Sequence, residues 1–366
     1  MTIYGIIPLV NYMLELLKEK ENIWDFLAKD GKPIVVYGMG NASEKIIENI
    51  RRFGGEVSEV FASDEFVRGH SFLGYKVLKY SEVCKKHKDF NVVVGFATHL
   101  DNVLENIKKI SLEHPTFAPD IPVAGDGLFT VEYVKENEDK FDRVYNLLAD
   151  DESKKVYLDI LNFKISAKVE YLFNSFAEKE LIYRDILKLS NDETIVDLGA
   201  YDGDTIREFT NFTKGKYRRI YALEPDEKNY KKLIKSTENM ENVIPYNMGA
   251  WNRQDILIFD KKAGRNSRLS SKGVPVKVSD IDTLIDDEIT MIKMDIEGSE
   301  LKAIEGCENT IKKYRPKLYI CAYHRNEDLF ALPLKILSIY DDYKIYFRHS
   351  KYIPAWECNF YIVKSS

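Results

Sequence analysis

A short apolar run that ends in a glycine turn and leads into a helical pattern occurs twice in this chain. The first run is Pro33–Gly38, followed by helical spacing over Ala42–Phe53. The second run is Thr194–Leu198, and a helix is expected over Asp204–Phe212. Strands that alternate with helices predict a parallel sheet with helices on its faces. Two such beginnings in 366 residues predict an α/β protein with two doubly wound, Rossmann-like domains.

The stretch between the two units has a different pattern. It is highly charged, and apolar residues such as Val144, Leu147 and Leu148 recur at helical spacing. We therefore expect an N-terminal Rossmann-like domain with leading helices at 1–130, a helical connector at 131–189 and a second domain at 190–366.

Composition excludes several classes of protein. A net charge of -6 argues against a general nucleic-acid binder, which usually has a basic excess. The four cysteines form no CxxC pair, so buried free thiols in a reducing compartment are expected. The segment Tyr4–Leu17 reads as an amphipathic helix, not as a signal peptide, and no apolar run reaches the roughly 20 residues of a membrane span. These features predict a cytoplasmic protein, and a homo-oligomer stays open.

The second turn carries the central signal. It reads Gly199-Ala200-Tyr201-Asp202-Gly203, and Glu224 ends the next strand. Glycine lets the backbone approach a ligand, and Glu224 is placed to accept hydrogen bonds from ribose hydroxyls. The turn lacks GxGxxG spacing, and its carboxylates would repel a pyrophosphate. They suit the ammonium and sulfonium groups of S-adenosylmethionine (SAM), which is the predicted cofactor.

Two other classes of function stay open at this point. A glycine turn with a downstream acid also fits an NAD(P)-dependent sugar-nucleotide oxidoreductase, which would use the first turn. That turn lacks a third glycine, and we can place no Tyr-x-x-x-Lys pair. The other class is a non-catalytic subunit that binds a nucleotide or glycan, and the intact motifs of the second domain argue against it.

A third apolar run, Met291–Met294, leads directly into Asp295 and Glu297. These two carboxylates lie on the same side of an extended chain, where an α/β sheet presents catalytic groups. Glu300, a few residues later, is expected only to begin the following helix, because acidic residues favour a helix N-terminus.

Several motifs in this order resemble the FkbM-type methyltransferase family, over about residues 190–362. The matching pieces are VDLGAYDGDT from Val196, ALEPD from Ala222, Gly249-Ala250-Trp251-Asn252, SDIDTL from Ser279, KMDIEGSE from Lys293, YHRNEDL from Tyr323 and Phe347-Arg348-His349. The resemblance implies a class I fold, with a seven-stranded sheet whose last strand is reversed. It also implies O-methylation of hydroxyls on sugars, glycans or polyketide-like metabolites, as in bacterial surface-polysaccharide pathways.

By that resemblance, Asp197, Gly199, Gly203 and Glu224 hold SAM, and the turn at Gly249 lies near the adenine. The predicted cofactor site therefore comprises Asp197, Gly199, Ala200, Tyr201, Asp202, Gly203, Glu224, Pro225, Gly249, Ala250, Trp251 and Asp295. The predicted acceptor is a sugar, a glycan or a nucleotide-linked sugar.

Methyl transfer to an alcohol needs a base that takes the hydroxyl proton as the new bond forms. His324 is the first candidate, because it follows a strand that ends near Asp295. Asp295 either orients that base or acts as the base itself, and His349 is a third option. Asp295, Glu297 and His324 can also hold a divalent metal ion, so a metal requirement stays open.

The first turn predicts a second nucleotide site. Gly38 and Gly40 form the turn, with Ser43 where a dinucleotide fingerprint has a third glycine or alanine. Asp64 follows the next strand, where it can meet a ribose, and Arg68 can meet a phosphate. This pattern resembles small nucleotide-binding domains attached to sugar-modifying enzymes. The alternative is a degenerate Rossmann unit kept for dimerisation or substrate docking.

Overall fold

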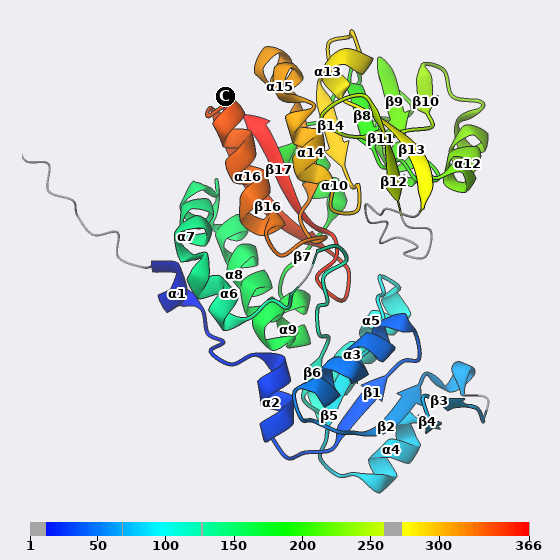
Figure 1. The fold of residues 1–366 in the computed structure, drawn as a ribbon, viewed down its shortest axis with the longest axis vertical. Helices are drawn as coiled ribbons and strands as arrows, with labels where there is room; N and C mark the ends of the chain where they lie inside the picture. The colour runs from blue at the N-terminus through cyan, green and yellow to red at the C-terminus, as the bar shows by residue number, and fades with distance from the viewer. Residues whose placement is uncertain (1–11, 68, 126, 260–272, 366) are drawn as a thin grey trace, which may run out of the picture.

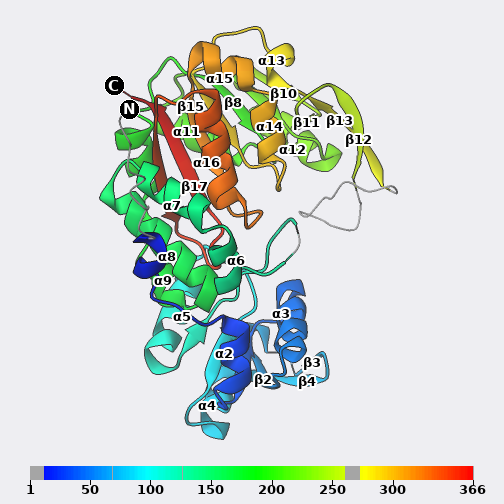
Figure 2. The same cartoon turned by 60° about the vertical axis from the view of Figure 1, so that its left-hand side comes forward.

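The computed structural model describes residues 12–67, 69–125, 127–259 and 273–365. Two sheets dominate it, one from the N-terminal third and one from the C-terminal half, with helices from the middle of the chain beside them (Figure 1). The same separation is visible after a turn about the vertical axis (Figure 2). The prediction of an α/β protein with two Rossmann-like units is confirmed.

The N-terminal sheet has the order β3-β4-β2-β1-β5-β6 among the described residues, and it is parallel except for the pair β3 and β4. Its strands and helices are β1 (Ile34–Tyr37), β2 (Val57–Ala62), β3 (Ser71–Phe72), β4 (Tyr75–Lys79), β5 (Asn91–Val94), β6 (Thr116–Phe117), α2 (Ile23–Lys29), α3 (Asn41–Arg52), the 3₁₀ turn Asp64–Phe66, α4 (Tyr80–Lys86) and α5 (Asp101–Glu113). All residues of β1 and β5 are buried, as central parallel strands require.

The predicted connector is mainly helical. It contains α6 (Val131–Glu136), α7 (Glu138–Leu147), α8 (Asp151–Ser166), α9 (Val169–Phe173), β7 (Phe176–Ala177), α10 (Lys179–Leu181) and a π-helix at Ile182–Ile186. Asp150 caps α8, because its side chain accepts the amide hydrogen of Ser153. Of the predicted helix Tyr4–Leu17, residues 4–11 lie outside the described residues, and the described helix is α1 (Tyr12–Leu16), which ends one residue earlier than expected.

The C-terminal sheet has the order β10-β9-β8-β14-β15-β17-β16-β7 among the described residues. Its strands are β8 (Thr194–Leu198), β9 (Arg219–Leu223), β10 (Val243–Tyr246), β14 (Met291–Met294), β15 (Lys317–Cys321), β16 (Tyr343–Ser350) and β17 (Cys358–Lys364). The last strand, β17, is antiparallel to both of its neighbours, as expected. The sheet has one strand more than expected, because β7 from the connector pairs with the end of β16.

Helices cover this sheet on both sides: α11 (Asp204–Phe212), α12 (Glu227–Thr237), α13 (Ile281–Leu284), α14 (Glu300–Glu305), α15 (Glu308–Tyr314) and α16 (Asp328–Ile339). A separate small sheet contains β11 (Gly249–Ala250), β12 (Asp255–Phe259) and β13 (Val274–Ser279). Strand β12 therefore does not extend the main sheet. Its residues alternate between half-buried and exposed, whereas all residues of β8 and β14 are buried.

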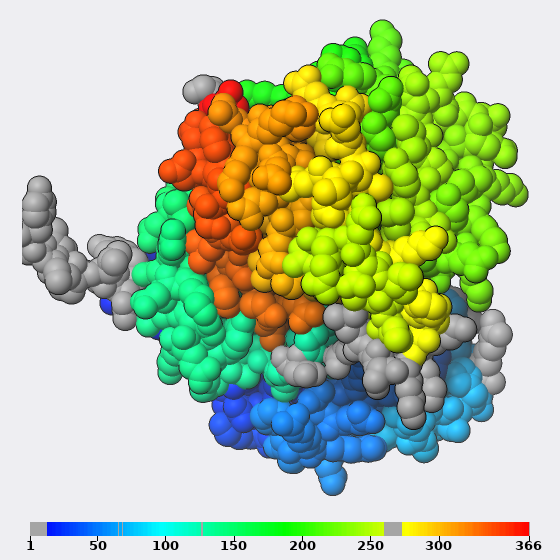
Figure 3. Space-filling model, turned by 45° about the horizontal axis from the view of Figure 1, so that its top comes forward, coloured from blue at the N-terminus to red at the C-terminus, as the bar shows by residue number. Residues whose placement is uncertain are grey.

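Loops at the carboxyl edges of the two large sheets contact each other. Thr98 follows β5, Ile353 lies between β16 and β17, and their backbones exchange hydrogen bonds of 2.8 and 2.9 Å. The amide of Ala124 donates to the carbonyl of His324 at 2.8 Å. In the space-filling view, the N-terminal unit (blue) lies directly beneath the C-terminal half (green to red) (Figure 3). The N-terminal unit thus touches the rim on which the predicted catalytic residues lie.

Two further predictions concern the surface and the thiols. No described helix is long and apolar enough to cross a membrane. All four cysteines are free, and Cys307, Cys321 and Cys358 are buried as expected. The prediction is wrong for Cys84, which is half-buried, because the short helix α4 turns this residue partly towards solvent.

Candidate functional site

The candidate site lies where four neighbouring strands of the C-terminal sheet end. Asp197 belongs to β8, Glu224 follows β9, Asp295 follows β14 and His324 comes shortly after β15. These strands run parallel and are adjacent in the sheet, so their carboxyl ends meet at one edge. Ligands of open α/β sheets bind at such an edge.

The glycine turn after β8 is fixed by close packing against the next loop. Gly199 has φ +84°, and a Cβ built on it would lie 1.9 Å from the carbonyl oxygen of Asp295. A side chain at this position would therefore displace the loop that carries Asp295. The amides of Gly199 and Ala200 both donate to the carbonyl of Leu223 at 3.0 Å, which ties the turn to β9. Gly203, with φ +85°, ends the turn before α11.

Glu224 is almost completely buried, with 6% of its surface exposed. One carboxylate oxygen accepts the amide hydrogen of Tyr201 at 2.9 Å, and the other accepts that of Asp226 at 2.8 Å. Burial raises the pKa of Glu224 to about 7, against the opposing effect of these two amides. A carboxylate has about four acceptor positions, so Glu224 keeps acceptor capacity for ligand hydroxyls.

A buried lysine that the sequence analysis missed links two of the predicted residues. The Lys293 ammonium lies 3.4 Å from Asp197 Oδ1 and 3.7 Å from Asp295 Oδ2. Burial alone would lower the pKa of Lys293. The carboxylates of Asp197 and Asp295 outweigh this effect and raise that pKa. Burial raises the pKa of Asp197, with Lys293 opposing. The available signal was a single charge inside the apolar strand Met291–Met294.

The other acidic residues of the turn, Asp202 and Asp204, have partners of their own. Asp202 forms an ion pair of 2.8 Å with Arg207, and Asp204 accepts the amide hydrogen of Thr205 within its own helix. The ring of Tyr201 lies under the ammonium of Lys232, at 5.0 Å. Of the three carboxylates predicted to repel a pyrophosphate, Asp197 is the buried one.

The predicted adenine turn lies beside the loop of Glu224. A Cβ built on Gly249 would lie 3.8 Å from the Cβ of exposed Pro225. Ala250 is buried, and the amide of Trp251 donates to the carbonyl of Ser279 at 2.9 Å. The structure thus brings this turn to the same side as the predicted ribose acid, while its role in binding stays a prediction.

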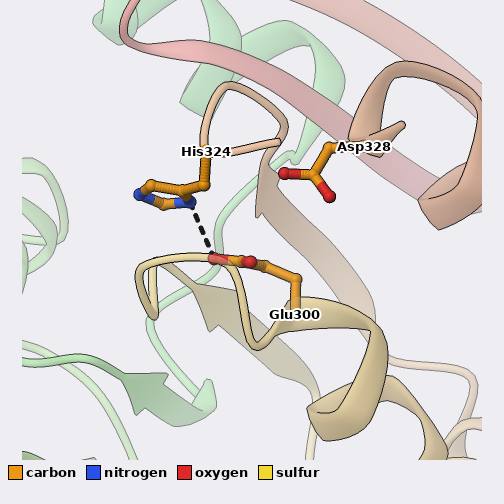
Figure 4. Close-up of side chains that lie close together, drawn as sticks. All are labelled: Glu300, His324 and Asp328. Atoms are coloured by element: carbon orange, nitrogen blue, oxygen red, sulfur yellow. Dashed lines mark ion pairs between the residues drawn. The ribbon is translucent and has the colours of Figure 1, made fainter. Parts of the chain in front are cut away.

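His324 is buried between carboxylates. Its Nδ1 lies 2.9 Å from Glu300 Oε1 (Figure 4). Its Nε2 lies 3.3 Å from Asp295 Oδ1. Burial alone would lower the pKa of His324, but Glu300 and Asp295 outweigh it and raise that pKa well above its usual value. Which of His324 and Asp295 takes the hydroxyl proton stays a prediction.

Asp295 is the most accessible member of this group. Its side chain is 27% exposed, whereas those of Lys293, His324 and Glu300 are at most 5% exposed. The hydroxyl of Tyr323 donates to Asp295 Oδ1 at 3.0 Å. Burial alone would raise the pKa of Asp295. The neighbouring Lys293 and His324 outweigh this effect and lower that pKa.

His349 lies apart from this group. It is fully buried on β16, its ring packs on Phe176 at 5.3 Å, and burial lowers its pKa to about 3. Within the described ranges, no ion pair or hydrogen bond joins His349 to Asp295 or His324. The structure therefore gives no support to His349 as the base.

The predicted metal ligands are only partly brought together. His324 Nε2 lies 3.9 Å from Glu297 Oε2 as well as 3.3 Å from Asp295. The ligand atoms that lie within 4.8 Å of one another in the described part of the chain belong instead to Glu300, His324 and Asp328 (Figure 4). In this group Glu300 also forms an ion pair with His324, and a metal requirement stays open.

The N-terminal turn is built differently. Gly38 has φ +116°, and a Cβ there would lie 2.6 Å from the ring of Phe96, whereas Gly40 has open space around it. Ser43 is buried and donates to the carbonyl of Gly95 at 2.9 Å. The side chain of Asp64 is 68% exposed and faces Lys79 at 3.6 Å. The predicted phosphate ligand Arg68 lies outside the described residues.

Comparison with known proteins points to one family. Residues 197–347 match the family model described as methyltransferase FkbM domain. The structure resembles that of methyltransferase FkbM from Methylobacillus flagellatus KT, with 25% identity, a TM-score of 0.72, and coverage of 96% of this chain and 95% of the other. No curated protein matches at a significant level.

Other solved methyltransferases match only about half of the chain. Precorrin-6y C5,15-methyltransferase from Geobacter metallireducens GS-15 has 14% identity and a TM-score of 0.34, and the match covers 52% of this chain and 93% of that one. Fibrillarin from Aeropyrum pernix, solved with natively bound S-adenosyl-L-methionine, has 12% identity and a TM-score of 0.31, covering 50% and 73%. These two likenesses are too distant to carry an argument.

Proposed function

We propose that this SAM-dependent methyltransferase, whose residues 197–347 form a methyltransferase FkbM domain, transfers its methyl group to a hydroxyl of a sugar or glycan. The observation that supports the placement of this chemistry is the contact between the two loops of the rim. Gly199, in the predicted SAM turn, packs directly on the backbone of Asp295. A methyl donor held by the first loop would therefore lie next to the carboxylate of the second.

In the proposed reaction, Asp295 takes the proton of the acceptor hydroxyl. Methyl transfer from a sulfonium is an in-line displacement, so the hydroxyl oxygen must lie behind the methyl group with water excluded. As the oxygen bonds to carbon it becomes strongly acidic, and a nearby carboxylate can then accept the proton. Asp295 is preferred to His324 because it is the exposed member of the pair and because His324 faces carboxylates on both sides.

The wider setting is also proposed. We place the reaction in the cytoplasm, in the biosynthesis of bacterial surface polysaccharides, with a nucleotide-linked sugar as one possible form of the acceptor. We keep the domain limits 1–130, 131–189 and 190–366 for truncation experiments. The loops of the N-terminal unit that touch the rim support a role for this unit in presenting the acceptor.

Calorimetric titration with S-adenosylhomocysteine (SAH), the demethylated product, tests the cofactor site. One molecule should bind per chain, and Glu224→Ala should weaken binding by about 100-fold, since it removes charge-assisted hydrogen bonds to ribose. Asp64→Ala, at the corresponding position of the other sheet, is the matched control and should leave the affinity unchanged. Binding of a nicotinamide dinucleotide instead of SAH would favour the oxidoreductase alternative and move the active site to the first turn.

Transfer of a labelled methyl group from SAM tests the acceptor class. Purified protein is incubated with labelled SAM and a panel of methyl glycosides, oligosaccharides and nucleoside-diphosphate sugars. Label should enter at least one of them, and Asp295→Asn should abolish the transfer. SAH calorimetry on the same variant separates lost proton transfer from lost cofactor binding. Transfer to non-sugar hydroxyl compounds alone would overturn the proposed substrate class.

A further inference from the structure

We propose that four aromatic side chains beside Asp295 form the binding site for the acceptor, and that they bind an uncharged sugar chain by stacking. The residues are Tyr323, Trp356, Tyr352 and His99, here called the aromatic row. The inference rests on the proposed function, because it names what binds next to the proposed base. It goes further in assigning the residues that contact the acceptor and in favouring a glycan over a nucleotide-linked sugar.

Ring contacts join these residues in sequence. The ring centroids of Tyr323 and Trp356 lie 6.4 Å apart, with 22° between the ring planes. Those of Trp356 and Tyr352 lie 5.8 Å apart at 29°, and those of Tyr352 and His99 lie 5.6 Å apart at 32°. Nearly parallel rings at such distances are offset, so each ring leaves part of its surface uncovered by the next.

The aromatic row begins at the proposed base. The hydroxyl of Tyr323 donates to Asp295 Oδ1 at 3.0 Å, and the ring centroid of Tyr323 lies 4.1 Å from that of His324. The other end of the row, His99, belongs to the loop between β5 and α5 of the N-terminal unit. An acceptor that lay along the row would therefore extend from the reacting hydroxyl to the N-terminal unit.

The rings keep accessible surface although they lie where the two units meet. Three of them are half-buried, and His99 is exposed. The backbone hydrogen bonds between Thr98 and Ile353 already hold this junction together. Aromatic side chains that fill the core of this region are fully buried, as Phe347 on β16 and Phe360 on β17 are. The row is therefore a surface and not a part of the core.

The chemistry of this surface suits a sugar chain. Aromatic rings carry partial negative charge on their faces, against which the C–H groups of a pyranose pack. Partly exposed carboxylates lie along the row: Asp295 and Glu297 near Tyr323, and Glu357 directly after Trp356. Carboxylates accept hydrogen bonds from sugar hydroxyls, and they repel a diphosphate.

Two cations in the same loops already have acidic partners. Lys351, which precedes Tyr352, forms an ion pair with Asp101, and Arg325 faces Glu327 at 3.7 Å. A diphosphate would have to displace an existing carboxylate partner, whereas the hydroxyls of an uncharged sugar need no such exchange. This difference favours a glycan over a nucleotide-linked sugar.

Tryptophan fluorescence of the full-length protein tests sugar binding without turnover. The chain has three tryptophans, and Trp356→Phe identifies the signal of Trp356. The probes are oligosaccharides of glucose, mannose, galactose and N-acetylglucosamine, each in increasing length. At least one series should change the Trp356 signal, with an affinity that rises with chain length, and uridine diphosphate alone should not. No response to any sugar series, or a response to uridine diphosphate alone, would overturn the proposal.

Calorimetry with the sugar that binds best tests the individual rings. Trp356→Ala should weaken binding about tenfold, as expected for the loss of one stacked ring, and Trp356→Phe should recover most of the affinity. His99→Ala should cost only about threefold, because exposed contacts at the edge of a binding site contribute less.

Tyr314→Ala is the matched control for these variants. Tyr314 is also a half-buried tyrosine, but it ends α15 ahead of β15 and so lies at the opposite edge of the sheet. This variant should bind the sugar as the parent protein does. Equal affinities of Trp356→Ala and Tyr314→Ala would contradict the assignment of the row.

SAH calorimetry separates failure of this inference from failure of the proposed function. A parent protein that binds SAH but no sugar overturns the aromatic row alone, and one that binds sugar but no SAH defeats the proposed methyl transfer alone. Trp356→Ala should bind SAH as the parent does, and Tyr352→Ala replaces it if it does not fold. In turnover, Trp356→Ala should raise the KM for the sugar about tenfold and leave the KM for SAM unchanged. An unchanged KM for the sugar would contradict the proposal.

Discussion

The turn after β1 and the turn after β8 follow the same local plan. Each joins a fully buried parallel strand to a helix through glycine residues, and each has an acidic residue at the end of the neighbouring strand. They differ in what surrounds the glycines. Gly199 packs on the backbone of a second loop, whereas Gly38 packs on the ring of Phe96 and Gly40 has no atom within 4 Å of a built Cβ. The C-terminal turn is therefore held against the backbone of a second loop, and the N-terminal turn is open at Gly40.

The acidic residues differ in the same way. Glu224 is 6% exposed and bonded to two backbone amides, while the side chain of Asp64 is 68% exposed and faces one lysine. An exposed ion pair of this kind contributes little. A local sequence pattern thus identifies where a site can form, and the buried contacts of the acid distinguish the region that is organised for a ligand.

The largest difference between the two regions is expected in stability, when one glycine in each turn is replaced by serine. Gly199→Ser should destabilise the protein by about 3 kcal/mol, because it forces a side chain into a left-handed position and against the Asp295 carbonyl. Gly40→Ser should be close to neutral, since Gly40 is the N-cap of α3 and serine favours that position. Urea denaturation measures both. Equal losses would show that the two turns are packed alike.

The strand ends and the order of the motifs could be predicted from sequence, because both are local. Strands such as β8 and β14 are short apolar runs, and the turn residues follow them directly. Lys293 was missed because its role depends on Asp197, which lies opposite it on the neighbouring strand of the sheet. The contact of Glu300 with His324 was missed for the same reason, since His324 comes from beyond the next strand.

The surroundings of His324 could not be predicted from local sequence. His324 was proposed as the base because it follows a strand that ends near Asp295, but its two carboxylate neighbours come from separate loops. The eighth strand was also not predictable, because β7 has only two residues and exists through its pairing with β16. Contacts between distant segments decide such features, and a single sequence does not specify them locally.

The pH dependence of SAH binding should distinguish the acids of the two regions. Burial places the pKa of Glu224 at about 7 in the unliganded protein, so the carboxylate is mostly protonated at pH 6 and mostly ionised at pH 8. If ribose hydroxyls bind the ionised form, affinity should rise about tenfold over this range, as expected for one proton. Glu224→Gln should be weaker and independent of pH, and Asp64→Asn should keep the parent profile. A flat parent profile would exclude ionised Glu224 as the binding form.

The smallest expected difference concerns the serines that close the two turns. Ser43 donates to the carbonyl of Gly95 at 2.9 Å, and Ser236 donates to the carbonyl of Asp202 at 2.6 Å. Each Ser→Ala substitution should cost about 1 kcal/mol of stability, with the larger loss at buried Ser43.

The substitutions Ser43→Ala and Ser236→Ala should differ in their effects on SAH binding. Ser236→Ala loosens the turn that carries Asp202 and should weaken SAH binding about threefold, a small loss consistent with one hydrogen bond outside the ligand contacts. Ser43→Ala should leave SAH affinity unchanged, because its hydrogen bond closes the other sheet. If Ser43→Ala weakened SAH binding as much as Ser236→Ala, the N-terminal turn would have to be coupled to the cofactor site. The loops that join the two carboxyl edges, at Thr98 and Ile353, would then be the first place to look for that coupling.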